Sequence, residues 1–333
     1  MIDLDALMAG APVWDTLFPA TPACGTFPSH FAMLERMRAS GYGAVSLTLA
    51  SDPEDMTGVI KRLALWYRHL ESNADHYRLL LTAEDFDVAR AEGRMAVGFH
   101  FQGTVAFGRD LGMVELYHRL GVRHALMAYN QRNDVADGCH ERTNGGLSRF
   151  GQELVAEMPR VGIVVDCTHT GERSAGDVFE IARAPVIYSH SNAAALKAHE
   201  RNIPDEMARE CAATGGVVGI NGIGLFLGDN DASTELLFRH LDHWVQLLGP
   251  AHVGIGLDTV SEPAVLSAHV HAAAARYPAG MGYETSQLAV AVPEQIRGLA
   301  QRMIEAGYAE ADIRAILGGN WQRVARQCWG GLT

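Results

Sequence analysis

The chain alternates between short apolar runs and longer segments in which apolar residues recur at helical spacing. The apolar runs predict β-strands over residues 12–17, 44–49, 95–101, 124–129, 162–167, 185–190, 216–221 and 252–258. Several of the intervening amphipathic segments close on glycine, as helix C-termini do. Near-continuous apolar strands that alternate with helices indicate a parallel sheet buried on both faces.

This pattern predicts a TIM-type (β/α)₈ barrel, because eight strands of this kind alternate with helices before residue 260. Residues 1–333 then form a single domain, and the helices after residue 290 pack on the outside of the barrel. A doubly wound open sheet is the alternative. It is less favoured because no glycine-rich phosphate loop follows the first strand, "PVWDTL".

Polar residues recur where the predicted strands end, which is where TIM-type barrels carry their catalytic groups. These residues are Asp15, Gln102, Tyr129, His169, His190, Asn221 and Asp258. Polar side chains at these places would be costly to bury without partners. The repetition therefore predicts a polar site at one mouth of the barrel.

Composition narrows the functional classes. The formal net charge of −12 argues against nucleic-acid binding. The five cysteines never form a Cys-x-x-Cys pair, which fits a reducing compartment. "MIDLDALMAG" lacks the positive charge of a signal peptide, and no apolar run is long enough to span a membrane. A cytoplasmic protein is expected.

Two histidines suggest a metal site. His169 in "VVDCTHTGERS" and His190 in "VIYSHSN" follow consecutive strands, so their imidazoles should be neighbours. Either alone is more typical of a hydrogen-bonded core histidine. Together with Asp258 and Asp15 they suit zinc, with an open position for catalysis. Arg201, eleven residues after His190, is either an anion clamp beside the metal or a surface arginine.

The long stretch from "YNQRNDVADGCHERTNGG" through "VIYSHSNAAALKAHERN", with "GGVVGINGIGLFL", "HVGIGLD" and "GGNWQRV", resembles the membrane (renal) dipeptidase family of zinc peptidases over roughly residues 95–325. The resemblance implies a (β/α)₈ barrel that hydrolyses dipeptides with two zinc ions bridged by a glutamate. It further implies that His169 and His190 bind zinc, that Arg201 grips the substrate carboxylate, and that Asp258 is the aspartate of the eighth strand.

Three departures from the family pattern change the expected metal content. The family's His-x-Asp on the first strand is read here as Val13-Trp14-Asp15, its bridging glutamate as Gln102, and a substrate-contacting histidine as Tyr129. Glutamine cannot neutralise the repulsion between two close cations. We therefore expect one firmly bound Zn²⁺ and a second that is weak or absent. His100, on the same strand face as Gln102, could replace part of the loss, although a packed core histidine is the simpler interpretation.

The leading hypothesis is a metal-dependent hydrolase that cleaves dipeptides or dipeptide-like amides with a metal-activated water. In this hypothesis His169, His190, Asp15, Asp258 and Gln102 form the metal site. Asp258 and Tyr129 act in catalysis, and Arg201, Tyr129 and Asn221 bind a substrate that carries a carboxylate. A barrel enzyme repurposed for a non-peptide substrate and a non-catalytic binding protein are the alternatives. The family resemblance also suggests a homodimer.

Two further pairs of histidines are not expected to bind metal. His240 and His243 are at helical spacing and are expected to face solvent or a partner helix on the outside of the barrel. His269 and His271 lie in the long segment 259–290 after the last strand. We expect that segment to be a lid over the site rather than a second metal site.

Overall fold

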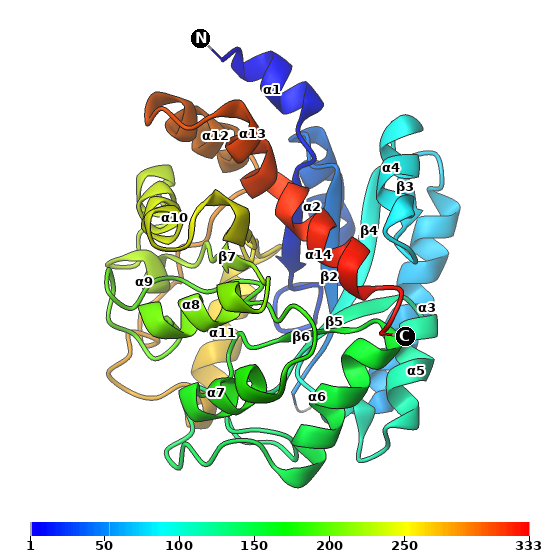
Figure 1. Ribbon diagram of the computed structural model, residues 1–333, viewed down its shortest axis with the longest axis vertical. Coiled ribbons are helices and arrows are strands. Elements are labelled where there is room, and N and C mark those ends of the chain that lie inside the picture. The colour runs from blue at the N-terminus through cyan, green and yellow to red at the C-terminus, as the bar shows by residue number, and fades with distance from the viewer. Residues whose placement is uncertain (1, 53, 333) are drawn as a thin grey trace.

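The computed structural model describes residues 2–52 and 54–332, and it contains a parallel sheet curled into a barrel (Figure 1). Its strands are β1 (Trp14–Phe18), β2 (Ala44–Ser51), β3 (Tyr77–Leu79), β4 (Met95–Gln102), β5 (Val122–Leu126), β6 (Val164–Asp166), β7 (Val218–Ile220) and β8 (Val253–Ile255). Their order around the sheet is β6-β5-β4-β2-β1-β8-β7, and β3 pairs with β4 outside this path.

The barrel closes through a segment that is too irregular to form a continuous strand. Parallel bridges join Asp166 to Ile187 and Tyr188 to Val218, so residues 187–188 connect β6 to β7. With this segment, the eight predicted strands surround one axis and the predicted TIM-type barrel is confirmed. The sequence pattern did not predict β3, because three residues are too few to show a period.

Helices cover the outside of the barrel (Figure 1). The α-helices are α1 (Leu4–Gly10), α2 (Phe27–Ala39), α3 (Met56–Ser72), α4 (Glu84–Ala91), α5 (Gly112–Arg119), α6 (Arg149–Val161), α7 (Glu172–Ile181), α8 (Asp205–Ala213), α9 (Gly224–Leu227), α10 (Thr234–Leu248), α11 (Pro263–Ala272), α12 (Gln295–Glu305), α13 (Glu310–Arg314) and α14 (Asn320–Cys328). Short helical turns are η1 (Val105–Phe107), η2 (Pro250–His252), η3 (Ala274–Arg276) and η4 (Ala315–Gly319).

Local sequence signals fix the helix ends. At α2, Thr26 and Ser29 form a reciprocal capping box, which sets the start of the helix at Phe27. At α6, Ser148 caps the start, and Gly162 takes the left-handed conformation that ends the helix.

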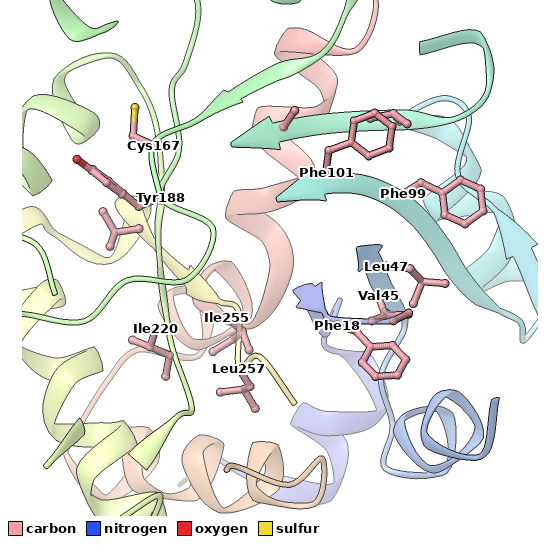
Figure 2. Packing of buried hydrophobic residues seen from close by; sticks show 14 of the residues in the cluster. Phe18, Val45, Leu47, Phe99, Phe101, Cys167, Tyr188, Ile220, Ile255 and Leu257 are labelled. Atoms are coloured by element: carbon pink, nitrogen blue, oxygen red, sulfur yellow. The ribbon is translucent and has the colours of Figure 1, made fainter. Parts of the chain in front are cut away.

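The main core lies between the strands and the surrounding helices. Figure 2 shows Phe18, Phe99, Tyr188 and Ile220, which come from four different segments of the barrel wall, pointing away from its centre. All four are almost completely buried. Alternate strand residues therefore point inward, and that inner position is where polar side chains such as His100 lie.

The last helix closes the end of the barrel at which the strands begin. Trp321 of α14 packs with Trp14, Val164 and Val217, each at or just before the start of its strand. The Trp321 indole nitrogen donates to the carbonyl of Ile255 at 3.1 Å. Figure 1 shows α14, in red, lying across the strands. With this end covered, any substrate must enter at the opposite end.

Candidate functional site

A cavity of about 420 Å³ lies at the carboxyl ends of the strands. Its polar lining comes from residues that follow several strands, and its apolar lining comes from the β1–α2 loop, α9 and the segment 259–290. The lining includes Pro19, Cys24, Asp52, Gln102, Tyr129, Asn130, His169, Arg201, Ile223, Phe226, Asp258, Val260, Leu266, His269, Val270, Tyr277, Tyr283 and Leu288.

His169 lines this cavity after β6 and is held in place by two neighbours. Its Nδ1 lies 2.6 Å from Oδ1 of Asn130, which leaves Nε2 free of that bond. The Tyr129 ring stacks on the imidazole with centroids 4.2 Å apart. Burial, reinforced by the charge of Arg201, holds the pKa of His169 well below its usual value. A neutral imidazole with one nitrogen fixed is the form that ligates metals.

His190 lies beneath His169, fully buried, and is not part of the cavity lining. Its Nδ1 is 2.7 Å from the Ser189 hydroxyl. Its Nε2 is buried without a hydrogen-bond partner among the described residues. The two imidazole centroids are 5.1 Å apart, so the predicted neighbourhood of these histidines is present. Burial, followed by the charge of Arg201, lowers the pKa of His190 well below its usual value.

Asp258 lines the cavity just beyond β8, and Asn221 orients it. The Asn221 Nδ2 donates to Oδ2 of Asp258 at 3.1 Å. Burial raises the pKa of Asp258 to about 6, while Arg201 and this hydrogen bond oppose the rise. Asn221, predicted to bind substrate, does not line the cavity itself and contacts it through Asp258. Its Oδ1 accepts from the Ile223 amide and its backbone groups bond to Asn192.

Arg201 extends into the cavity from the loop after His190. It is only 2% exposed, and its guanidinium lies 5.2 Å from the ring centre of Phe226. Its one side-chain hydrogen bond within the described chain is a 3.3 Å contact with the carbonyl of His190, and its Nε is buried without a partner. No carboxylate of the described residues forms a salt bridge with it, although its charge acts on Asp258. Such a cation is arranged to receive an anion from outside the chain.

Gln102 reaches the cavity at the end of β4 as predicted. Its amide nitrogen donates to the Thr48 hydroxyl at 3.0 Å, and that hydroxyl contacts Nε2 of His100 at 2.8 Å. His100 is therefore a buried core residue, stacked on His124 with centroids 4.3 Å apart. It does not reach the cavity lining.

Asp15 does not reach the mouth of the barrel, contrary to prediction. It is the second residue of β1, is fully buried, and lies outside the cavity lining. Its Oδ1 accepts from the amides of Leu17 and Leu257 at 2.9 and 3.1 Å, and burial raises its pKa to about 7. The residue directly after β1, Pro19, lines the cavity and has no metal-binding atom in its side chain.

Val13 lies further from the cavity than Asp15. Its carbonyl accepts from the amides of Gly43 and Ala44, where β2 begins, and the side chain is fully buried. Val13 therefore lies at the end of the barrel opposite the cavity, and the interpretation of this position as a lost metal ligand is wrong. A residue cannot coordinate an ion beside His169 from that depth.

Backbone strain is concentrated around the cavity. Asn130, His169 and Asp258 all have φ between 56° and 64°, a left-handed conformation that is uncommon for residues other than glycine. All three line the cavity. Strain of this kind is typical of functional sites, where surrounding packing holds side chains in a required direction.

The family's two-ion zinc centre does not fit these residues. Within residues 2–52 and 54–332, no three His, Cys, Asp or Glu side chains are grouped so as to hold a metal ion. What is present is two imidazoles, each fixed through Nδ1, with the Nε2 of His190 buried and unpartnered. Two imidazoles are fewer protein donors than the three or four usual for a zinc ion.

The segment 259–290, here called the lid, covers the cavity as expected and is tied to the barrel at several points. The Tyr283 hydroxyl forms a 2.9 Å hydrogen bond with Nε2 of His140. The Nδ1 of His140 in turn contacts the Glu200 carboxylate at 2.7 Å. The Gln131 side chain donates to the carbonyl of Ala275 at 2.9 Å. The side chain of Tyr277 also lies next to that of Tyr129.

Sequence reasoning missed some site residues. Asn130 and Asp52 each follow a strand and line the cavity, so the strand-end rule could have found both. Asp52 is already occupied, because it accepts from the Val105 amide and from Asn133. The role of Ser189, which orients His190, is not indicated by the sequence except that the two residues are adjacent. Nothing in the sequence indicates that the lid tyrosines belong to the site.

A parallel barrel with a polar cavity at the carboxyl ends of its strands places this chain among the TIM-type barrel proteins, whose active sites lie at that end. The membrane dipeptidase family (peptidase family M19) matches residues 24–273, and the chain belongs to this family. The resemblance inferred from the motifs is thereby confirmed. The matched range contains His169, His190, Arg201 and Asp258, and it begins after Asp15.

Individual relatives agree with the family assignment. The dipeptidase aclJ of Aspergillus oryzae is 36% identical over 171 residues, which cover 50% of this chain and 40% of the relative. An uncharacterised dipeptidase of Schizosaccharomyces pombe is 31% identical over 219 residues, 63% of this chain and 51% of the relative. This chain thus spans about half the length of these relatives.

Among solved structures, an amidohydrolase from Pseudomonas aeruginosa is similar over 99% of this chain and 100% of its own, with a TM-score of 0.87 and 28% identity. Despite the family name, every helix within the described residues is too short or too polar to cross a bilayer.

Proposed function

We propose that this protein hydrolyses dipeptides or dipeptide-like amides that carry a free carboxylate, with one zinc ion bound between His169 and His190. Family membership supports the reaction class. The observation that carries the proposal is Arg201, a nearly buried guanidinium that faces the cavity and has no acidic partner in the described chain. A planar fork of donors suits a carboxylate, and burial strengthens the attraction.

The zinc proposal is narrower than the family's two-ion arrangement. His169 and His190 would hold the ion through their Nε2 atoms, since each Nδ1 is already engaged. When bound, zinc supplies a Lewis acid that polarises a carbonyl. With two imidazoles as the main donors, we propose exchangeable rather than firm binding.

The chain's own residues supply the remaining roles. Arg201 fixes the carboxylate, and this sets the scissile amide over His169. Oδ1 of Asp258, which is not used by Asn221, takes the proton from the attacking water. The Tyr129 hydroxyl donates toward the developing oxyanion. The lid keeps bulk water away from the amide.

The test compares Arg201→Met with Arg201→Lys in zinc-supplemented hydrolysis of a dipeptide panel. Methionine keeps the volume against Phe226 and removes the charge, so KM should rise about ten- to hundred-fold. Lysine keeps the charge but loses the two-pronged donor geometry, so the KM of Arg201→Lys should lie between those of the parent and of Arg201→Met. Unchanged kinetics in Arg201→Met would refute the clamp.

The same panel distinguishes the alternatives. If the unmodified protein binds carboxylate-bearing amides without cleaving them, the chain is a binding protein. If dipeptides neither bind nor react while other carboxylates bind, the chain acts on a non-peptide substrate. Both alternatives are tested because Gln102 stands where the family has its bridging glutamate, so the usual two-zinc chemistry lacks one of its ligands.

A further inference from the structure

The side of the cavity next to Arg201 is apolar. Its residues belong to a cluster that is separate from the barrel core and that the lid largely completes. Those that line the cavity are Cys24, Ile223, Phe226, Val260, Val270, Tyr277, Tyr283 and Leu288. We call these residues the apolar wall.

The apolar wall begins at the guanidinium itself. Phe226 lies 5.2 Å from the Arg201 guanidinium carbon and 6.3 Å from the Tyr283 ring, and Tyr283 lies 5.0 Å from Tyr277. A carboxylate held by Arg201 therefore brings the atoms attached to it within reach of these rings.

Two acidic groups elsewhere in the cavity are already engaged, and Arg276 of the lid is a second cation in the lining. Asp52 is engaged by the Val105 amide and by Asn133, and Glu54 pairs with Arg62. The polar floor, formed by Gln102, His169 and Asp258, belongs to other elements than the wall. The cavity thus has a polar floor and an apolar flank, with the cation of Arg201 where the two meet.

We infer that the apolar wall is the subsite for the side chain of the residue whose carboxylate Arg201 holds. The substrate class is then an amide whose carboxylate-bearing residue is large and apolar, such as leucine or phenylalanine, rather than glycine or an acidic residue. This inference rests on the proposed function for the position of the carboxylate. Apolar walls that border a water-filled cavity gain stability when a ligand covers them.

The first measurement is binding without turnover. Calorimetry on the full chain compares N-acetylglycine, N-acetylleucine, N-acetylphenylalanine and N-acetylaspartate, which share the carboxylate and one amide. Burial of a leucine or phenylalanine side chain should tighten binding about ten- to hundred-fold over N-acetylglycine. N-acetylaspartate should bind no better than N-acetylglycine.

A matched pair of variants then tests the wall. Tyr283→Ser removes the ring, and Tyr283→Phe keeps the ring while removing the hydroxyl that contacts His140. The preference for N-acetylphenylalanine over N-acetylglycine should fall about tenfold or more in Tyr283→Ser and persist in Tyr283→Phe. Leu266→Asn, at a half-buried lid position that lines the cavity, should also reduce the preference.

The outcomes separate this inference from the proposed function. Equal affinity for all four probes, or N-acetylglycine as the tightest, overturns the subsite while leaving the carboxylate clamp in place. Apolar preference without hydrolysis of any dipeptide supports the subsite and overturns the proposed reaction. Failure of every probe to bind overturns both.

Discussion

His169 and His190 lie with imidazole centroids 5.1 Å apart and ring planes tilted by 59°, and each is fixed through Nδ1 by a neighbouring oxygen. His169 reaches the cavity lining, whereas His190 is completely buried beneath it. Orientation of one ring nitrogen by an oxygen partner is how proteins prepare the other nitrogen for a metal. The pair therefore defines where an ion would bind and also how few protein donors would hold it.

Zinc binding should be single and exchangeable. We expect about one zinc per chain in zinc-containing buffer, and loss of that zinc on dialysis against a mild chelator, because two imidazoles are fewer donors than zinc sites normally have. His169→Asn and His190→Asn should each weaken binding at least tenfold. His269→Asn is the control, since His269 lines the same cavity away from this pair. Elemental analysis that finds two ions after dialysis would contradict this prediction.

Asp15→Asn should raise stability at alkaline pH without affecting zinc. Burial raises the pKa of Asp15 to about 7 from its usual value near 3.8, so the folded state favours the protonated carboxyl. As pH rises from about 4 to 7 the unfolded chain releases this proton first, and the parent protein loses up to about 4 kcal/mol that the variant keeps. Asparagine retains an oxygen for the Leu17 and Leu257 amides.

Denaturant unfolding at pH 4.5 and pH 8 measures the Asp15 effect. The stability difference between variant and parent should grow across this range. If the variant instead bound zinc more weakly and its stability showed the same pH dependence as the parent, Asp15 would be a metal ligand. Its role would then not be that of a buried carboxyl below the cavity.

The sequence predicted the barrel because helix and strand periods alternate regularly, and it predicted Tyr129, Gln102, His169, His190 and Asp258 in one region because parallel strands end together. Arg201 was expected there from the family resemblance and from its place in the loop after His190. It could not predict depth along a strand. Asp15 occupies the second position of β1, with the strand continuing to Phe18, and only the register with Ile255 reveals that its carboxylate lies below the cavity.

Long-range partners were also beyond the sequence pattern. Asn221 is a polar residue at a strand end, but its hydrogen-bonding groups are engaged by Asn192, Asp258 and the Ile223 amide, and the sequence pattern does not show these partners. The apolar wall joins the lid to α9 and to the β1–α2 loop, which are far apart in the chain. Helical spacing alone predicted solvent or a partner helix for His240, which is fully buried.

His240→Gln should flatten the acid dependence of stability. His240 accepts from the Ala193 amide at 3.1 Å and contacts the Leu227 carbonyl at 3.0 Å. Burial lowers its pKa to about 4, so between pH 6.5 and 4 the unfolded chain takes up a proton that the folded chain refuses. The parent loses about 1.4 kcal/mol per pH unit through this group as pH falls, and the variant does not.

Unfolding free energies at pH 7, 6, 5 and 4.5 test this assignment. The variant should be less stable at pH 7, because two buried hydrogen bonds are disturbed. Its loss of stability toward acid should nevertheless be shallower than that of the parent. An equally steep loss in both proteins would show that His240 is not among the groups that make the fold acid-sensitive.

The cavity lining indicates Pro19, rather than Val13, as the position at the end of the first strand from which a second metal ion could be bound. Pro19 and Gln102 line the cavity at the ends of β1 and β4. Neither carries a negative charge, so nothing there offsets the repulsion between two close zinc ions. Pro19→Asp with Gln102→Glu would supply two carboxylates, and the Thr48 hydroxyl, now beside the Gln102 amide, can turn to donate to the new one. We expect the zinc content to rise from about one toward two per chain in the double variant and to change less in either single variant. Elemental analysis in the same zinc-containing buffer, with thermal unfolding to establish that the variants are folded, decides the outcome. A folded double variant that still binds a single ion would mean that these positions do not face the same site as His169.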